Sequence, residues 1–536
     1  MGKDSGMMDL DSVDFKELAA SVASFASFPG TPSDASVKEL LDRFPLTVLF
    51  SSLQREEEVP GIVESVVAAF ERIFKATYGI SLLPEILPYA NLGLNASFPS
   101  IRRLTCLVIG KALENNDMSG GALLQEVVES DVLVPLLNAV ADEDASVAKS
   151  ASEAVEVLAK TPLGLELLFT DKGLGTGRLK EMALQVPALV QIRILSLAAA
   201  IFGLSELAAA AIQGSGVLSV LEAELDNTSD TLAHINSLEI LSELAATHNG
   251  VKFLLAGKFI NRLVSLIGNS EVDTVVRSHA MRVGARLISC LIVTPTAPRD
   301  SEVHGVLDAI AKNLENLNEV SGDAERNEKA VGIDALGQIG TSREGAELLL
   351  HRPKPVASYI VRAAFVDRQG SSIEVAGIHA LAFIAGSERL DTSPLLSEQT
   401  ETSLHDLIYS ALDDSASHSL SNLLWSLLQQ APEIRQATYR LLIPLVARRW
   451  CLWEVCYHSD LISFVTDPQT EANKDGMEWR HAFCIATCTA LAAAVQQGDA
   501  MSTGILEKLD SAVRRGPYLP KEQAEAQPVV ATEDRF

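Results

Sequence analysis

The hydrophobic residues of this chain recur at helical spacing, in groups of three short segments. Residues 133–170 show the pattern, because apolar residues at steps of three and four predict three consecutive helices there. The carboxylate of Asp144 is the expected N-cap of the second helix, and Thr161-Pro162 is expected to end that helix, since proline cannot donate a hydrogen bond to an upstream carbonyl. None of the three helices can cover its own apolar stripe, so the unit needs neighbours that stack on it.

The same unit returns along the chain at intervals of about 43 residues. With Leu158 as a phase marker, the equivalent apolar residues are Ile73, Leu113, Leu158, Ile201, Leu244, Leu287, Ile339, Ile384 and Leu427. Three units share an apolar residue, a threonine, a glycine and a closing apolar run: LAKTPLGLELLF (158–169), LAATHNGVKFLL (244–255) and IGTSREGAELLL (339–350). A period of about 40–47 residues is typical of armadillo and HEAT repeats. The sequence therefore predicts an all-α fold, an armadillo/HEAT-like right-handed α-solenoid of about nine to ten repeats.

The domain organisation follows from where this pattern begins and ends. We expect a flexible N-terminus over 1–12, a single continuous solenoid over 13–515 and a flexible, polar C-terminal tail over 516–536. Within the solenoid, degenerate capping repeats are expected at about 13–60 and 440–515. The composition, with 47% hydrophobic but only 5% aromatic residues, agrees with packed helices.

The formal net charge is −27, and it disfavours nucleic acid and anionic membranes as partners. This negative charge favours a basic partner or contributes to the solubility of the protein. The most apolar region, 186–212, is interrupted by Gln191, Arg193 and Glu206, so it is expected to form solenoid helices rather than a membrane span. The six cysteines are too few and too scattered for a disulfide framework, and no secretory signal is recognisable, which indicates reduced thiols in an intracellular protein.

The sequence contains no motif of an enzyme. The glycine-rich stretch 172–177 lacks both the GxGxxG spacing and a preceding strand, and we find no Walker A, HExxH or GxSxG sequence. A zinc site is conceivable near the C-terminus, where the candidates are Cys451, Cys456, His458, His481, Cys484 and Cys488. The CxxC pairs typical of structural zinc are absent, so buried thiols are the competing and favoured interpretation. We therefore expect no catalysis, no cofactor and no metal.

Two columns of residues, five and one positions before each marker, are expected to line the inner face of the solenoid. The first column is polar throughout, and in the middle repeats both columns carry charged or hydrogen-bonding groups. The predicted partner-binding groove consists of Glu153, Glu239, Glu243, Arg282, Arg286, Asp334, Gln338, His379 and Asn422. The alternative is a solvated inner face whose charges neutralise one another. The columns lack the repeated Trp and Asn of importin-type adaptors, which disfavours a nuclear-import adaptor.

Several segments resemble the 26S proteasome non-ATPase regulatory subunit 5 family: SVAKSASEAVEVLAKTPLGLELLF (146–169), LSELAATHNGVKFLLAGKFINRL (241–263), VGIDALGQIGTSREGAELLL (331–350) and the tail motif Gly516-Pro517-Tyr518 followed by Lys521. The likeness extends over nearly the whole chain in order. It implies a dedicated assembly chaperone that binds the C-terminal domain of a proteasomal AAA ATPase subunit, and base assembly intermediates, and leaves before the proteasome is complete.

The resemblance further implies a cytoplasmic protein, with the nucleus as a second location, that is a monomer on its own. From the residues alone, a general armadillo scaffold in ubiquitin signalling or trafficking is the alternative.

Overall fold

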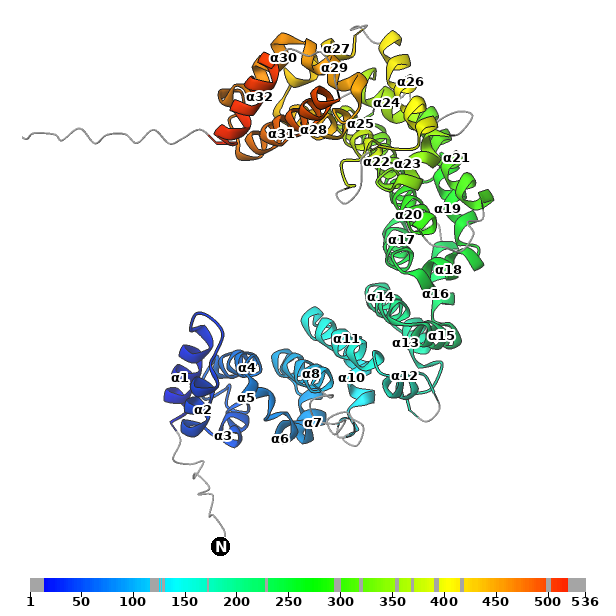
Figure 1. Cartoon of the computed structure of the whole chain (residues 1–536). Coiled ribbons are helices and arrows are strands. Elements are labelled where there is room, and N and C mark those ends of the chain that lie inside the picture. The colour runs from blue at the N-terminus through cyan, green and yellow to red at the C-terminus, as the bar shows by residue number, and fades with distance from the viewer. Residues whose placement is uncertain are drawn as a thin grey trace, which may run out of the picture. The chain divides into compact units, whose positions relative to one another are not determined.

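The structure is a computed structural model, and its elements are helices throughout the part of the chain that it describes (Figure 1). The described residues are 14–115, 125, 127, 131–170, 173–226, 230–293, 300–317, 322–351, 356–367, 371–389, 395–414, 419–497 and 503–518. The predicted flexible N-terminus, 1–12, lies outside them. None of the described helices has the length and apolar character needed to cross a bilayer.

The chain divides into two compact units, Met1–Phe253 and Leu254–Phe536. The single continuous solenoid over 13–515 stays a prediction. The N-terminal unit contains α1 (Phe15–Ser27), α2 (Asp34–Arg43), α3 (Leu46–Ser52), α4 (Ile62–Ile73), α5 (Thr77–Ile80), α6 (Leu83–Ile86), η2 (Leu87–Tyr89), α7 (Ala90–Leu94), α8 (Pro99–Glu114), α10 (Leu133–Ala139), α11 (Ala145–Ala159), α12 (Pro162–Phe169), α13 (Arg178–Gln185), α14 (Ala188–Leu204), α15 (Glu206–Ser215), α16 (Leu218–Asp226) and α17 (Thr231–Ala245). The boundary falls within α18 (His248–Ala256).

The C-terminal unit continues with the same kind of element. Its helices are α19 (Phe259–Gly268), α20 (Thr274–Val293), α21 (Asp300–Asn316), α22 (Asp323–Ile339), α23 (Arg343–Leu350), α24 (Ala357–Phe365), α25 (Ser371–Ala385), α26 (Glu398–Asp414), α27 (Leu420–Leu428), α28 (Pro432–Leu445), α29 (Arg449–Tyr457), α30 (Ser459–Thr466), η5 (Pro468–Thr470), α31 (Lys474–Gln496) and α32 (Thr503–Arg515).

One helix of each repeat packs on its counterpart in the next repeat, and we call these the ladder helices. In the N-terminal unit they are α4, α8, α11, α14 and α17; in the C-terminal unit they are α20, α22, α25, α28 and α31 (Figure 1). The phase markers from Ile73 to Ile384 are buried on ladder helices, which confirms the all-α solenoid. Leu427 is buried too, but it lies on α27, which is not a ladder helix.

The predicted three-helix unit is present as α10, α11 and α12. Asp144 caps α11, since its Oδ1 accepts the backbone N–H groups of Ser146 at 2.8 Å and Val147 at 3.2 Å. At the next corner Thr161 caps α12, because its Oγ1 accepts the N–H of Gly164 at 3.0 Å. The same cap recurs in two further repeats. The N–H of Gly250 donates to Oγ1 of Thr247 at 3.1 Å, and the N–H of Gly345 donates to Oγ of Ser342 at 3.0 Å.

Glycine is needed at these corners because the backbone passes very close to the preceding helix. A Cβ on Gly164 would lie 1.9 Å from the carbonyl oxygen of Leu158, well inside contact distance. A Cβ added to Gly250 would lie 2.0 Å from the carbonyl oxygen of Leu244, and one added to Gly345 would lie 1.8 Å from that of Ile339. The Thr/Ser and Gly of the repeated sequence therefore fix the sharp turn from each ladder helix into the next helix.

Ion pairs that are partly or fully buried join successive repeats. In the N-terminal unit Arg102 on α8 donates to both oxygens of Asp142, at 2.7 and 2.9 Å, and so ties α8 to the turn before α11. In the C-terminal unit Arg277 on α20 makes the same forked contact with Glu328 on α22, with both distances at 2.7 Å. Such bidentate pairs fix geometry as well as contributing energy, so they set the register between neighbouring repeats.

The last described residues, 516–518, lie against α31, although the pattern placed them in the flexible tail. Arg480, which is almost fully buried, donates to the carbonyl of Pro517 at 3.3 Å and to that of Val465 at 2.9 Å. The phenol of Tyr518 donates to Glu478. The remainder of the predicted tail, 519–536, is outside the described residues.

Candidate functional site

The predicted groove residues lie at the surface of their respective units. In the N-terminal unit Glu153 on α11 and Glu239 and Glu243 on α17 are exposed. In the C-terminal unit the equivalent side chains stand on three successive ladder helices: Arg282 and Arg286 on α20, Asp334 and Gln338 on α22, and His379 on α25. The first four of these are exposed, and His379 is half-buried. We call these five residues the ladder face of the C-terminal unit.

Small residues bring the helices of the ladder face close together. A Cβ on Gly337 would lie 2.7 Å from the Cβ of Ala380, and one on Gly340 would lie 2.6 Å from Cγ1 of Ile384. The backbones of α22 and α25 therefore approach as closely as glycine allows, which places the polar columns of the two helices side by side.

Burial, together with charges on neighbouring helices, shifts the pKa of two groups on the ladder face. The crowded surroundings of Asp334 exclude water and raise the pKa of its carboxyl group, although its side chain still reaches the surface; Arg282 opposes this shift. The pKa of His379 is lowered, first by burial and then by the positive charge of Arg440. The ladder face thus keeps His379 neutral at pH 7 while it presents guanidinium groups beside a carboxyl group.

Arg440 on α28, rather than Asn422, continues the column beyond His379. Its Nη1 lies 3.5 Å from Nδ1 of His379, and its guanidinium lies 4.8 Å from the ring centroid of Phe383. It also forms an ion pair with Glu388. Asn422 is exposed on α27, outside the ladder helices, so the structure does not bring it together with the others. The start of α28 at Pro432, a residue favoured in the first turn of a helix, is the sequence signal that would have corrected the phase.

A polar hollow of about 280 Å³ opens beside the ladder face, between α20 and α22. Its lining consists of polar side chains and three apolar ones: Thr274, Ser278, His279, Arg282 and Asn327, with Val275, Ala324 and Val331. Hydroxyl, imidazole, guanidinium and amide groups all offer hydrogen-bond donors, and Arg282 adds a positive charge. The hollow can therefore accept a carboxylate or a carbonyl group of a bound protein.

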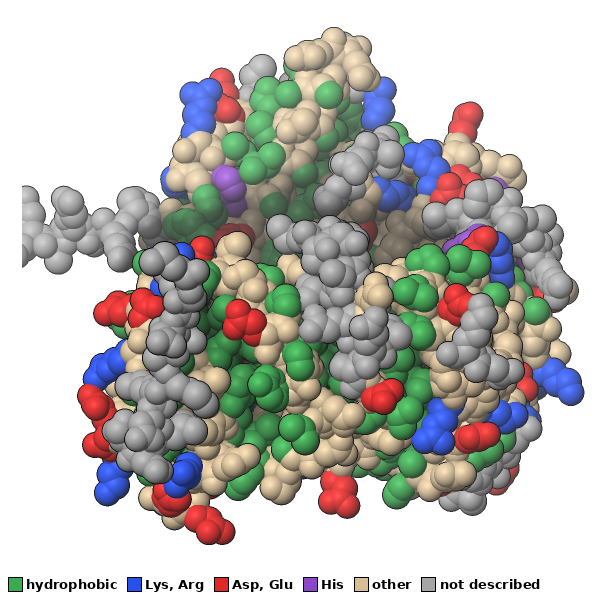
Figure 2. All heavy atoms as spheres, turned by 90° about the horizontal axis from the view of Figure 1, so that it is seen from below, with side chains coloured by type: hydrophobic (Ala, Val, Ile, Leu, Met, Phe, Trp, Pro, Cys, Tyr) green, Lys and Arg blue, Asp and Glu red, His purple; other side chains and the backbone are tan. Residues whose placement is uncertain are grey.

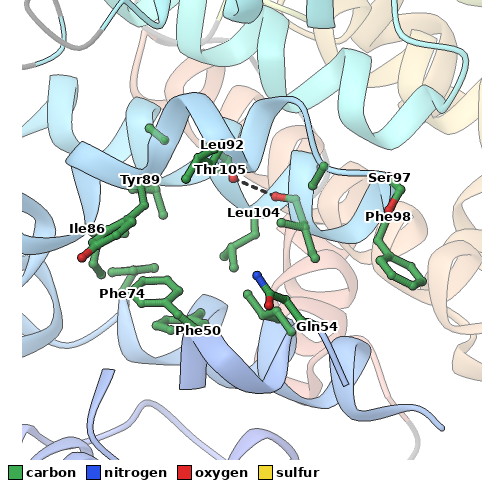
Figure 3. Close-up of a pocket in the computed structure, with 17 residues that line it drawn as sticks. Phe50, Gln54, Phe74, Ile86, Tyr89, Leu92, Ser97, Phe98, Leu104 and Thr105 are labelled. Atoms are coloured by element: carbon green, nitrogen blue, oxygen red, sulfur yellow. Dashed lines mark hydrogen bonds between the residues drawn. The ribbon is translucent and has the colours of Figure 1, made fainter. Parts of the chain in front are cut away.

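The N-terminal unit contains an apolar pocket that sequence reasoning missed (Figure 3). Its volume is about 550 Å³, and it lies among α3, α4, α7 and α8. The residues labelled in Figure 3 are Phe50, Gln54, Phe74, Ile86, Tyr89, Leu92, Ser97, Phe98, Leu104 and Thr105. No described residue that lines the pocket carries a formal charge. The signal in the sequence was the gathering of aromatic residues between 50 and 98, in a chain where aromatics are scarce.

Large side chains at the rim of this pocket are open to solvent. Leu92 is 75% exposed and Tyr89 is 53% exposed. Figure 2 shows further hydrophobic side chains at the surface, between scattered acidic and basic groups. The pocket can hold apolar side chains of a partner, since burying them there removes apolar area from water on both proteins.

The C-terminal cysteines and histidines take part in packing. Cys451, Cys456 and Cys484 are buried, and burial raises the pKa of these thiols to about 12, about 12 and about 11. Nδ1 of His458 accepts the N–H of Leu461 at 3.2 Å, and Nε2 of His481 lies 3.1 Å from the carbonyl oxygen of Val513. Among the described residues, no group of three or more His, Cys, Asp and Glu side chains could hold a metal ion.

Comparison with known proteins identifies a family that matches most of the chain. Residues 31–536 match the family described as proteasome non-ATPase 26S subunit. The chain is similar to the 26S proteasome non-ATPase regulatory subunit 5 of Bos taurus, with 21% identity over 80% of each protein. It is 23% identical to that of Mus musculus over 63% of each protein, and 23% identical to that of Homo sapiens over 53% of each.

Two solved structures of designed proteins are also similar. An engineered protein aligns over 89% of this chain and 97% of its own, with 15% identity and a TM-score of 0.38. A designed armadillo repeat protein in complex with the peptide (KR)4 aligns over 50% of this chain and 99% of its own, with 16% identity and a TM-score of 0.34.

Proposed function

Because the chain belongs to the proteasome non-ATPase 26S subunit family, we propose that it is a non-catalytic chaperone for assembly of the regulatory-particle base. It binds the C-terminal domain of a proteasomal AAA ATPase subunit through the ladder helices and is absent from the mature proteasome. The observation that carries the proposal is the match over residues 31–536, together with the regulatory subunit 5 relatives.

The surface chemistry supports a role in protein binding. The N-terminal unit offers the carboxylates of Glu239 and Glu243, four residues apart on α17, and the apolar pocket of about 550 Å³. The C-terminal unit offers guanidinium groups on α20 and the polar hollow that contains Arg282. Each unit thus has charged and forked hydrogen-bonding groups on regular helices, which are rigid supports for a binding site.

The mechanism that we propose is steric and thermodynamic. A solenoid bound to the C-terminal domain of one ATPase covers the surface by which that domain docks on the proteolytic core. Release requires only a competing contact that is stronger in the assembled state than in the intermediate, because a ligand shifts an equilibrium by its difference in affinity for the two states. No chemical step is needed.

The test is a pull-down of purified proteasomal ATPase C-terminal domains with the full chain. The double variant Glu239→Lys, Glu243→Lys should weaken binding while helicity by circular dichroism stays unchanged. Arg282→Glu with Arg286→Glu tests the ladder face of the C-terminal unit in the same way. A matched control is Glu181→Lys with Glu222→Lys, which makes the same charge change at exposed positions of α13 and α16, outside the ladder helices.

Equal binding by both ladder variants and the control would remove the ladder helices from the binding site. If no proteasomal ATPase domain binds the unaltered chain, the chaperone proposal itself is wrong.

A further inference from the structure

The helix α29 presents three aromatic side chains and one carboxylate on a single face. Trp450, Trp453, Glu454 and Tyr457 stand at positions i, i+3, i+4 and i+7, so they are neighbours on the helix surface. Together with Ser421 and His458 they line a hollow of about 270 Å³. The helix is not a ladder helix, and the proposed function does not use this hollow, which we call the α29 cage.

The aromatic walls of the cage contact one another and, at Trp450, two rings of a neighbouring helix. Trp453 packs against Tyr457 with ring centroids 6.0 Å apart and an interplanar angle of 34°. Trp450 meets two rings of α26 edge-on: Tyr409 at 6.0 Å and His405 at 5.4 Å. A side chain that is already braced loses little rotamer freedom when a ligand arrives, so Trp450 is a preorganised wall of the cage.

One negative charge faces the aromatic rings. Among the described residues that line the cage, Glu454 is the only one with a formal charge when histidine is neutral. Its Oε2 accepts the backbone N–H of Ser421 at 3.3 Å, which fixes the carboxylate against the N-terminal end of α27. The phenol of Tyr409 also hydrogen-bonds to Glu454. A carboxylate has about four acceptor positions, so Glu454 still has capacity for a donor from outside.

We propose that the α29 cage binds the cationic side chain of an arginine or lysine presented by another protein. Two indoles and a phenol line the hollow, and the face of such a ring attracts a cation through its quadrupole; the carboxylate of Glu454 adds a charge-assisted hydrogen bond. At about 270 Å³ the hollow is smaller than a typical small-molecule pocket of about 300–1,000 Å³, which suits one side chain. The net charge of −27 also favours the approach of a basic segment.

Other occupants fit the chemistry less well. An acidic side chain would be repelled by Glu454. An apolar side chain would cover the carboxylate without giving it a donor, which costs free energy. The wall formed by Tyr457, which is 73% exposed, leaves the cage open to an incoming side chain.

The experiment is a titration of the full chain, labelled with ¹⁵N at the tryptophan indoles, with three blocked tripeptides: Gly-Arg-Gly, Gly-Lys-Gly and, as a neutral control, Gly-Gln-Gly. The chain has four tryptophans, and Trp450→Phe and Trp453→Phe assign the two signals of the cage. We expect the arginine or lysine peptide to shift the signals of Trp450 and Trp453 while Trp479 stays unchanged. The stronger of the two identifies whether guanidinium or ammonium is preferred.

Glu454→Gln keeps the shape of the side chain and removes its charge, so it should weaken the binding of the cationic peptides roughly five-fold. The matched control is Glu507→Gln, which removes an exposed charge from α32 and should leave binding unchanged. The proposal is overturned if the glutamine peptide shifts the cage signals as strongly as the cationic peptides do. It is also overturned if neither cationic peptide shifts them, or if Glu454→Gln binds as tightly as Glu507→Gln.

Discussion

Gly164→Ala tests the physical requirement at the corner between α11 and α12. The added Cβ would lie 1.9 Å from the carbonyl oxygen of Leu158, whereas such atoms essentially never approach within 3.0 Å, so the backbone must move by about 1 Å. Overpacking of this kind costs about 1–3 kcal/mol, and loss of the Thr161 cap adds about 1 kcal/mol. The better helix propensity of alanine returns at most about 1 kcal/mol. We therefore expect a net destabilisation of about 2 kcal/mol.

Gly214→Ala is the matched control, because the same substitution on α15 meets nothing within 4 Å. In Gly214→Ala the higher helix propensity of alanine is the effect that remains, so this variant should be more stable by up to about 1 kcal/mol. Urea unfolding followed by circular dichroism measures both variants. With a slope of about 3 kcal/mol/M, Gly164→Ala should lower the midpoint by about 0.7 M. If Gly164→Ala instead raises the midpoint as Gly214→Ala does, the corner does not require glycine.

Two further predictions concern the C-terminal unit. Arg277→Met removes the guanidinium partner of Glu328, which is fully buried and keeps a hydrogen bond from the side chain of Asn313 at 2.8 Å. The free energy of unfolding should therefore fall by about 3–5 kcal/mol. Combining Arg277→Met with Glu328→Leu should recover most of that loss in stability. The pKa of His379 is lowered in the folded state, so at acidic pH the unfolded state binds more protons than the folded state does. The stability that this group contributes is therefore lost as the pH falls below about 6.5. Arg440→Met removes the second cause of that shift, so an NMR titration should find the pKa of His379 higher in the variant than in the unaltered chain.

The fold was predictable because its repeating features are local. Asp144 caps α11 through backbone groups two or three residues away, and Thr161-Pro162 follows directly after the end of that helix. The apolar period places Leu158 and its equivalents in the core. The resemblance to the 26S proteasome non-ATPase regulatory subunit 5 family is likewise confirmed by the match over residues 31–536.

Features that depend on distant contacts were not predictable. Asp142 is the acceptor for Arg102, which lies forty residues earlier, and nothing in the local pattern around Asp142 indicates this pair. Leu427 has the same apolar period as the true markers, because α27 buries its apolar face as fully as a ladder helix does. The predicted column of polar residues was therefore continued to Asn422, whereas the residue next to His379 is Arg440. Periodicity shows which face of a helix is buried, but not which layer of the solenoid the helix joins.

The apolar pocket of the N-terminal unit was missed for a similar reason. Phe50, Tyr89 and Phe98 come from separate elements, and each alone fits an ordinary repeat core. Only the packing of α3, α7 and α8 leaves their rings around a common space (Figure 3).

The most direct test of the proposed function is affinity purification of the full chain from cells, with the bound subunits identified by mass. The account predicts proteasomal AAA ATPase subunits of the base in the eluate, without the subunits of the proteolytic core. Recovery of complete 26S particles, or of no ATPase subunit at all, would contradict it.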